Sequence, residues 1–279
     1  MKLQLLKRTG LAFLLMVITL TSPAQTLSFG NDSTITGFDS LVFVTNVSHL
    51  DEFISRFNGE SYRADKPELK RNRADGILLL FDGERLKNAG DSALVAAGTF
   101  CDRVVSDSIL LDKHLGNWYV EATCTGLMNR QKVEFKLFLS MEPRPNYGYK
   151  WVLTGAEGDL FKTSRHQNVE GLSLSATDHE LQFMSLKRVT RDLYEYIDEY
   201  TSDSYRADPL STFLTLVRTG QLKITHVNRL DYHFMDVPGY AFTVSKVRRL
   251  TLNSGWLITG FRPCDEFEKQ TILFKVGKK

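Results

Sequence analysis

The sequence contains none of the short motifs that usually mark an enzyme active site. A phosphate-binding loop, HExxH, CxxC and GxSxG are all missing, and none of the six histidines are paired four residues apart. These absences remove the main sequence evidence for nucleotide hydrolysis, zinc proteolysis, dithiol chemistry and serine hydrolysis. We therefore favour a non-enzymatic protein, and we expect neither a metal ion nor a cofactor.

Cysteine is also scarce. The three cysteines, Cys101, Cys124 and Cys264, allow at most one disulfide with one thiol left over, and no two of them have the spacing of a metal site. We interpret them as small buried apolar residues, with a single disulfide as the open alternative.

Long apolar runs are limited to one, "GLAFLLMVITL" at 10–20. Three basic residues precede it, and the small residues "SPA" follow at 22–24, which is the pattern of a signal peptide. The run is shorter than the roughly 20 residues that span a bilayer. We predict cleavage after Ala24, export to the periplasm or the extracellular space, and no transmembrane segment in the remaining chain.

Neither sign of charge is in large excess. The chain has 35 basic and 33 acidic residues, and removal of 1–24 would leave 32 basic residues against the same 33 acidic ones. No long basic run follows the predicted signal. This balance argues against nucleic acid as a partner and leaves an unknown small molecule or an envelope protein.

What the sequence does contain is an internal match. Residues 49–65 align without a gap to 192–208, at an offset of 143, and 8 of the 17 positions are identical. Both segments end in SYRAD, at 61–65 and 204–208. A match of this order over a fixed offset indicates a duplicated unit.

Each copy of the match predicts an amphipathic helix. Apolar residues recur at i, i+3, i+4 and i+7 in both. The two stripes are Leu50, Phe53, Ile54 and Phe57, and Leu193, Tyr196, Ile197 and Tyr200. We expect Ser48 and Thr190 as N-caps and Gly59 at the end of the first helix. In the second copy, Asp208 and Pro209 are expected to begin a further helix over 210–217.

Strand-like segments follow the helices in both halves, and 89–108 reads as an additional helix that begins near Asp91. The segments of the first half are 117–125, 132–139 and 149–155, and those of the second are 221–227, 229–235, 240–250 and 254–260. The last segment of each half shares W-x-x-T-G, and we interpret Trp151 and Trp256 as sheet-packing residues. Helices followed by antiparallel strands describe an α+β unit.

Paired helices that lead into a bent antiparallel sheet resemble the NTF2-like, or cystatin-like, folds. The strings "FISRFNGE", "NWYVEATCTG", "ELQFMSLKRV", "RADPLSTFLTLVRTGQL" and "NSGWLITGF" also resemble a family of exported bacterial proteins of uncharacterised activity. The resemblance implies two related NTF2-like units, each with helices packed on a curved sheet. The expected boundaries are 1–24 for the signal, 25–155 and 189–279 for the units, and 156–188 for the linker.

Three residues are candidates for acid/base chemistry. Asp231 and His233 lie two apart on a predicted strand and so share one face, with Arg229 beside them. Glu121 is a single carboxylate on the polar face of the strand at 117–125. We interpret Asp231 and His233 as solvent-exposed.

Two functions remain open. We favour a non-enzymatic binding or interaction module of the cell envelope, because catalytic motifs are missing and a duplication can build a groove. The alternative is a small-molecule isomerase or dehydratase, since NTF2-like enzymes hold an acid/base residue inside the cone. Buried candidate side chains in a closed cavity would favour the enzyme.

Overall fold

The computed structural model describes residues 46–60, 72–114, 116–145, 148–162, 186–192, 194–202, 204–249 and 253–278. The helices are α2 (Leu50–Asn58), α3 (Arg73–Leu78), α4 (Gly83–Ala89), α5 (Asp91–Ser106), α6 (Leu186–Asp192), α7 (Pro209–Arg218) and α8 (Glu266–Lys275), with 3-10 helices η2 (Asp159–Phe161) and η4 (Tyr194–Tyr200). The strands are β1 (Asn46–Val47), β2 (Trp118–Met128), β3 (Gln131–Pro143), β4 (Tyr149–Glu157), β5 (Leu222–Phe234), β6 (Tyr240–Val247) and β7 (Ser254–Pro263). The predicted signal peptide, the first SYRAD and Leu193 lie outside the described residues.

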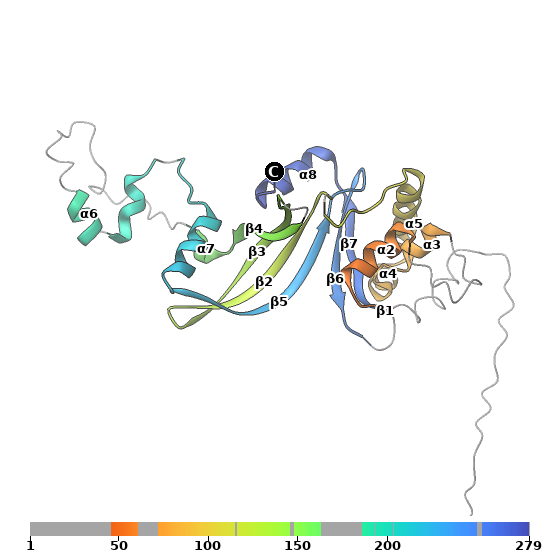
Figure 1. Ribbon diagram of the computed structural model, residues 1–279, viewed down its shortest axis with the longest axis horizontal. Helices are drawn as coiled ribbons and strands as arrows, with labels where there is room; N and C mark the ends of the chain where they lie inside the picture. Colours follow the sequence, from red (N-terminus) through yellow and green to blue (C-terminus); the bar gives the residue numbers. More distant parts are fainter. Residues whose placement is uncertain are drawn as a thin grey trace, which may run out of the picture.

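The strands form one sheet in the order β1-β7-β6-β5-β2-β3-β4 (Figure 1). All neighbours are antiparallel except the short parallel pair β1 and β7. The predicted α+β class is confirmed. However, β2–β4 and β5–β7 come from different halves of the chain and meet where β2 pairs with β5, so the two halves share one sheet and do not have one sheet each.

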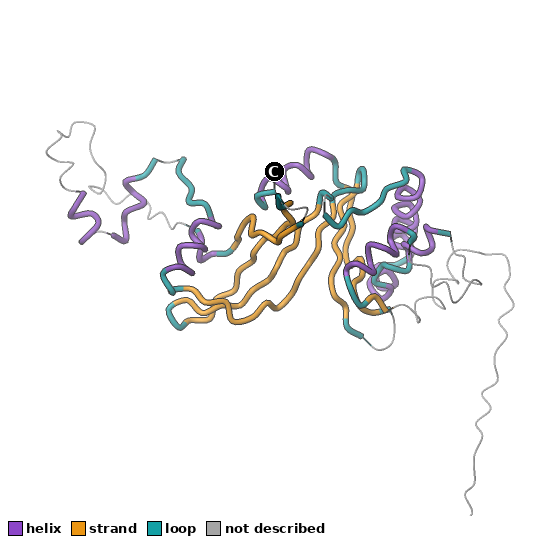
Figure 2. Tube along the Cα trace, viewed as in Figure 1, coloured by secondary structure: helices purple, strands orange, loops and turns teal. Residues whose placement is uncertain are grey.

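The two faces of the sheet carry different helices (Figure 2). On β2, Trp118 and Val120 belong to the main core under α2, α3 and α5, whereas Tyr119, which points the other way, packs with Leu273 and Val276 at the end of α8. A further apolar cluster joins α7 and η2 to β2, β3, β4 and the start of β5. None of the described helices is long and apolar enough to cross a bilayer.

The first predicted helix is confirmed as α2. Its apolar stripe is buried at Phe53, Ile54 and Phe57, and Gly59 ends it in the left-handed conformation with φ 81°. The N-cap prediction is wrong by one residue, because His49 occupies that position without a side-chain bond. The N–H of Ser48 instead donates to Glu52 Oε2 at 2.8 Å, so a helix side chain reaches back over the first turn.

The second predicted helix, over 190–200, is replaced by α6 and η4. Thr190 lies inside α6 and does not cap it, and Tyr196 has non-helical angles (φ −109°, ψ 15°). The stripe residue Ile197 is 42% exposed. A short amphipathic helix is stabilised mainly by packing of its apolar face. This segment projects beyond α7 and away from the sheet (Figure 1), so its apolar face does not pack on the described strands as that of α2 does.

The second SYRAD occupies the loop before α7. Asp208 caps this helix, accepting a hydrogen bond from the Ser211 N–H at 2.9 Å, and Pro209 stands in the first turn. Both predictions for this helix start are confirmed. The expected additional helix is also confirmed as α5, which begins at Asp91.

The strands predicted at 221–227 and 229–235 form a single strand, β5. It pairs with β2 along its whole length, with two register shifts, at Thr123/Cys124 and at Thr125/Gly126. The neighbour on the other side, β6, pairs with β5 only from Asp231 to Phe234. Over 222–230, no described strand pairs with the outer edge of β5.

The tryptophans of the W-x-x-T-G segments lie on β4 and β7. Trp151 packs edge-on against Trp118 with ring centroids 5.7 Å apart, and Trp256 packs edge-on against Tyr232 at 5.0 Å. Their interpretation as sheet-packing residues is therefore confirmed, although Trp151 is 46% exposed. The three cysteines are buried and unpaired, which favours their interpretation as small apolar residues.

Candidate functional site

The structure brings Glu121 next to Asp231 and His233, the two candidates that the sequence already placed on one strand face. In the register of β2 and β5, Glu121 stands opposite Asp231, and Tyr119 stands opposite His233. All four therefore lie on the face of the sheet that α8 partly covers. The Nε2 atom of His233 is 3.9 Å from Glu121 Oε2. We call Glu121, Asp231 and His233 the polar cluster.

Asp231 is buried, with 5% exposure, so the prediction that it is solvent-exposed is wrong. Arg229 Nε donates to its Oδ1 at 2.8 Å, and Ser245 Oγ on the adjacent strand β6 donates to the same oxygen. The sequence does not show that β6 adds a hydroxyl beside this carboxylate. Both donors engage Oδ1, so this oxygen already has hydrogen-bond partners within the protein.

His233 is half-buried, with a side-chain exposure of 21%, so it is also less exposed than predicted. Its ring stacks on Tyr119 with centroids 4.8 Å apart, and Nδ1 lies 3.1 Å from Thr243 Oγ1. Nε2 is buried and has no hydrogen-bond partner among the described residues. This nitrogen faces Glu121 at a distance too long for a hydrogen bond.

The charges around His233 oppose one another. Burial lowers the pKa of His233, which is the largest effect. Glu121 and Asp231 act to raise this pKa, whereas Lys136 and Arg229 act to lower it. Glu121 is itself paired with Lys136 at 3.0 Å, and their hydrogen bond raises the pKa of that lysine. The imidazole is therefore neutral near pH 7.

A neutral buried His233 makes stability depend on pH. Because its folded-state pKa lies below that of the unfolded chain, the unfolded chain binds the proton first as the pH falls. Stability is then lost as the pH falls through the unfolded value of about 6.5. We expect urea denaturation to show a larger loss of stability between about pH 7.5 and about pH 5 in the native protein than in His233→Gln. His226→Gln, at an exposed position of β5, should keep the native loss. Equal losses in the native protein and His233→Gln would contradict this assignment.

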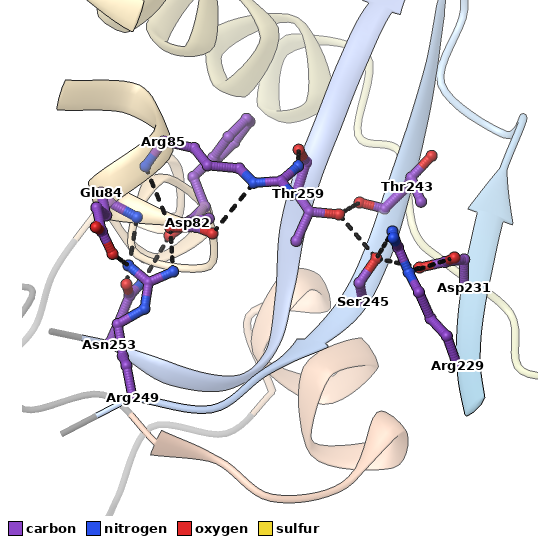
Figure 3. A network of polar contacts seen from close by, with 12 residues as sticks. Asp82, Glu84, Arg85, Arg229, Asp231, Thr243, Ser245, Arg249, Asn253 and Thr259 are labelled. Atoms are coloured by element: carbon purple, nitrogen blue, oxygen red, sulfur yellow. Dashed lines mark hydrogen bonds and ion pairs between the residues drawn. The ribbon is translucent and has the colours of Figure 1, made fainter. Parts of the chain in front are cut away.

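A line of polar contacts runs from the polar cluster to the start of α4 (Figure 3). Ser245 Oγ lies 2.9 Å from Thr259 Oγ1, and the backbone carbonyl of Thr259 accepts from Arg85 Nη1 at 2.6 Å. Arg85 is also 3.6 Å from Asp82, the N-cap of α4. The line crosses three strands and one helix, so it ties these elements together.

Asp82 is the most buried carboxylate on this line, with 2% exposure. Arg249 Nη2 donates to its Oδ1 at 2.6 Å, and the backbone N–H of Arg85 donates to the same atom at 3.3 Å. Beside it, Asn253 donates to the carbonyls of Leu79 and Phe81. No sequence pattern pointed to these residues, because their contacts join segments about 170 positions apart.

An open pocket lies at the other end of this line, where β1, β6 and β7 meet. It has a volume of about 460 Å³ and is lined by Val47, Ser48, Lys246, Val247, Arg248, Arg249, Ser254 and Gly255. We call it the basic pocket. Gly255 is required here, because its φ is 99° and a Cβ would lie 2.0 Å from the carbonyl oxygen of Val47.

The three cations of the basic pocket differ in their partners. Arg249 has a side-chain exposure of only 14% and is paired with Asp82 at 2.6 Å and Glu84 at 2.8 Å. Lys246 and Arg248 are exposed, and Lys246 lies over the ring of Trp256. None of the described lining residues is acidic. The short string "KVRR" at 246–249 was the available sequence signal, and it was too brief to count as a basic run.

The polar cluster and the basic pocket differ in what they can do. The cluster satisfies its charges internally, whereas the pocket presents two exposed cations around an open volume. Among the described residues, no group of three or more His, Cys, Asp or Glu is placed to hold a metal ion. Comparison with protein-family models, with curated proteins and with solved structures finds no match to this chain.

Proposed function

We propose that the protein is an exported, non-enzymatic binding module of the cell envelope that takes an anionic group in the basic pocket. The observation that carries the proposal is the pocket of about 460 Å³ with Lys246 and Arg248 exposed on its lining. This volume falls within the range of about 300–1,000 Å³ that is usual for ligand sites. The predicted signal peptide supports the envelope as the place of binding.

The chemistry of the lining selects the ligand class. A guanidinium binds planar oxyanions with two parallel hydrogen bonds, and an ammonium adds a mobile positive charge. Ser48 and Ser254 contribute hydroxyl groups. Phosphate, sulfate and carboxylate groups fit this set. The charge of Arg249 is balanced by Asp82 and Glu84. Lys246 and Arg248 therefore supply the net positive charge of the pocket.

Two related NTF2-like units are part of the same proposal. The match at an offset of 143 supports a duplication, and both W-x-x-T-G segments lie on strands, β4 and β7. In this proposal the duplicated units fuse edge to edge through β2 and β5. The helix of the first half, α2, then packs on strands of the second half, with Phe53 against Phe234 of β5 and Phe57 against Phe242 of β6.

The alternative is a small-molecule isomerase or dehydratase that uses the polar cluster. It is favoured by the convergence of Glu121, Asp231 and His233 on one face. It is opposed by the internal pairing of these groups, since Asp231 is engaged by Arg229 and Ser245. The binding module remains the preferred function because its pocket is open and its exposed cations are available.

Anion binding is tested with inorganic pyrophosphate and isothermal titration calorimetry. The double variant Lys246→Ala/Arg248→Ala is expected to bind at least about tenfold more weakly, since charge-assisted hydrogen bonds contribute about 1.5–3 kcal/mol each. Raising the salt concentration should weaken binding by the native protein.

Two controls accompany this experiment. Arg218→Ala/Lys223→Ala removes two exposed cations on α7 and β5, away from the pocket, and should leave the affinity unchanged. Asp231→Asn alters the polar cluster and should also leave it unchanged. Native affinity in Lys246→Ala/Arg248→Ala, or no binding by the native protein, would refute the proposal.

A further inference from the structure

One segment of the chain is both acidic and rich in aromatic residues. Between 192 and 203 the sequence contains no lysine or arginine. Its acidic residues are Asp192, Glu195, Asp198, Glu199 and Asp203. We call the described residues 192 and 194–202, which include η4, the acidic arm. Asp192 is paired with Arg191 at 2.8 Å, and the remaining acidic residues have no lysine or arginine among them in the sequence, so the arm keeps a local excess of negative charge.

The acidic arm also exposes large apolar side chains. Tyr194 is 64% exposed and Ile197 is 42% exposed. The equivalent of Ile197 in the first copy of the internal match is Ile54, which is 7% exposed in the core under α2. An apolar residue that is buried in one copy and exposed in the other, beside an exposed tyrosine, indicates a surface that another molecule can cover.

We propose that the acidic arm of one molecule docks in the basic pocket of a second copy of this chain. The inference rests on the proposed function, because it assigns the anionic partner of that same pocket. Acidic side chains of the arm would meet Lys246 and Arg248, and its tyrosines would lie against the apolar part of the lining, Val47 and Val247.

The placement of the two elements makes the contact intermolecular. The acidic arm lies at one end of the molecule, near α6, and the basic pocket lies near the opposite end, beside β1 (Figure 1). An arm at one end does not reach a pocket at the other end of the same molecule. Docking between copies therefore joins two different surfaces, which gives a reciprocal dimer, a closed ring or an open chain.

Sedimentation velocity tests the contact with charge reversals on both sides. The native protein should show a mass that rises with concentration and falls with added salt. The arm variant Glu195→Lys/Asp198→Lys/Glu199→Lys, in which three of the four acidic residues of the arm become basic, and the pocket variant Lys246→Glu/Arg248→Glu should each remain monomeric when alone, with association weakened at least about tenfold.

An equimolar mixture of the two variants should associate again. In the mixture, the reversed arm meets the reversed pocket, and the native acidic arm meets the native basic pocket. Each variant on its own has an arm and a pocket of the same sign. Glu134→Lys/Glu142→Lys, at two exposed positions of β3, is the matched control and should associate as the native protein does.

The outcomes separate this inference from the proposed function. A native protein that stays monomeric at every concentration, variants that still associate alone, or a mixture that fails to associate would each overturn arm docking. The arm variant should keep pyrophosphate binding, because its pocket is intact. Pyrophosphate binding without self-association would therefore refute the docking and leave the proposed function standing, whereas loss of both would refute the two together.

Discussion

Replacing Ile54 by alanine is expected to lower the free energy of unfolding by about 2–5 kcal/mol. Ile54 is 7% exposed and belongs to the core that α2 forms with the sheet. Truncating a buried isoleucine removes its transfer free energy and leaves a cavity in a packed core. Denaturant midpoints for the variant and the native protein measure this difference.

The same replacement at Ile197 provides the matched comparison. The two isoleucines occupy equivalent positions of the internal match, but Ile197 is 42% exposed on η4. Its truncation should change the free energy of unfolding by less than about 1 kcal/mol. From the sequence alone, both apolar stripes predict that truncating the isoleucine lowers the free energy of unfolding by the larger amount. A loss of several kcal/mol at Ile197 would mean that η4 packs against the molecule.

Replacing Asp82 by alanine is expected to cost about 3–5 kcal/mol, because it removes one partner of a buried ion pair. Asp82 is 2% exposed, and the side chain of Arg249, its partner at 2.6 Å, is 14% exposed. The substitution also removes the N-cap of α4. Thermal and urea unfolding should both show the loss.

Two further variants separate the effect of losing the buried charge from the effect of losing the N-cap of α4. Asp82→Asn keeps an oxygen that can accept from the N–H of Arg85 and loses the charge, so it should cost less than alanine. Glu84→Gln should cost less than about 1 kcal/mol, because an exposed partner contributes little. An Asp82→Ala protein as stable as the native one would show that Arg249 finds another partner.

Local signals predicted much of the fold. Gly59 ends α2, Asp208 and Pro209 begin α7, and Asp91 begins α5, since each effect depends on a few neighbouring residues. Alternation predicted β3, where Phe135 and Leu137 are buried. In these segments, short-range signals indicate where each element begins or ends and which face it buries.

Longer-range pairing could not be read from the sequence. Nothing in 117–125 or 221–235 indicates that β2 and β5 pair, because registers between distant strands depend on the whole packed arrangement. Helix α8 was missed for a different reason. Its Lys269 is 2% exposed and donates to Glu266 and the carbonyl of Val237, while Phe267 is 84% exposed. Because a lysine is buried and a phenylalanine is exposed, the usual amphipathic pattern of a helix is absent from this segment of the sequence.

The candidate sites were predictable to a similar degree. The sequence identified Glu121, Asp231 and His233 as polar groups on strand faces, because alternation is local. It also placed Arg229 beside Asp231, but it could not predict that Glu121 meets these residues or that Ser245 engages Asp231. The basic pocket combines Val47 with residues about 200 positions later, so only the folded chain shows it.

The long strand β5 has a consequence for how the protein behaves at high concentration. Over 222–230, no described strand pairs with its outer edge, so its backbone groups on that side are a template for strand addition. Straight open edges of this kind nucleate fibrils. The two register shifts against β2 fall within this stretch, and such bulges bend and twist a strand locally. A second straight strand cannot follow a bent edge for more than a few residues, so the irregularity that shapes β5 also protects the protein from fibrillar aggregation.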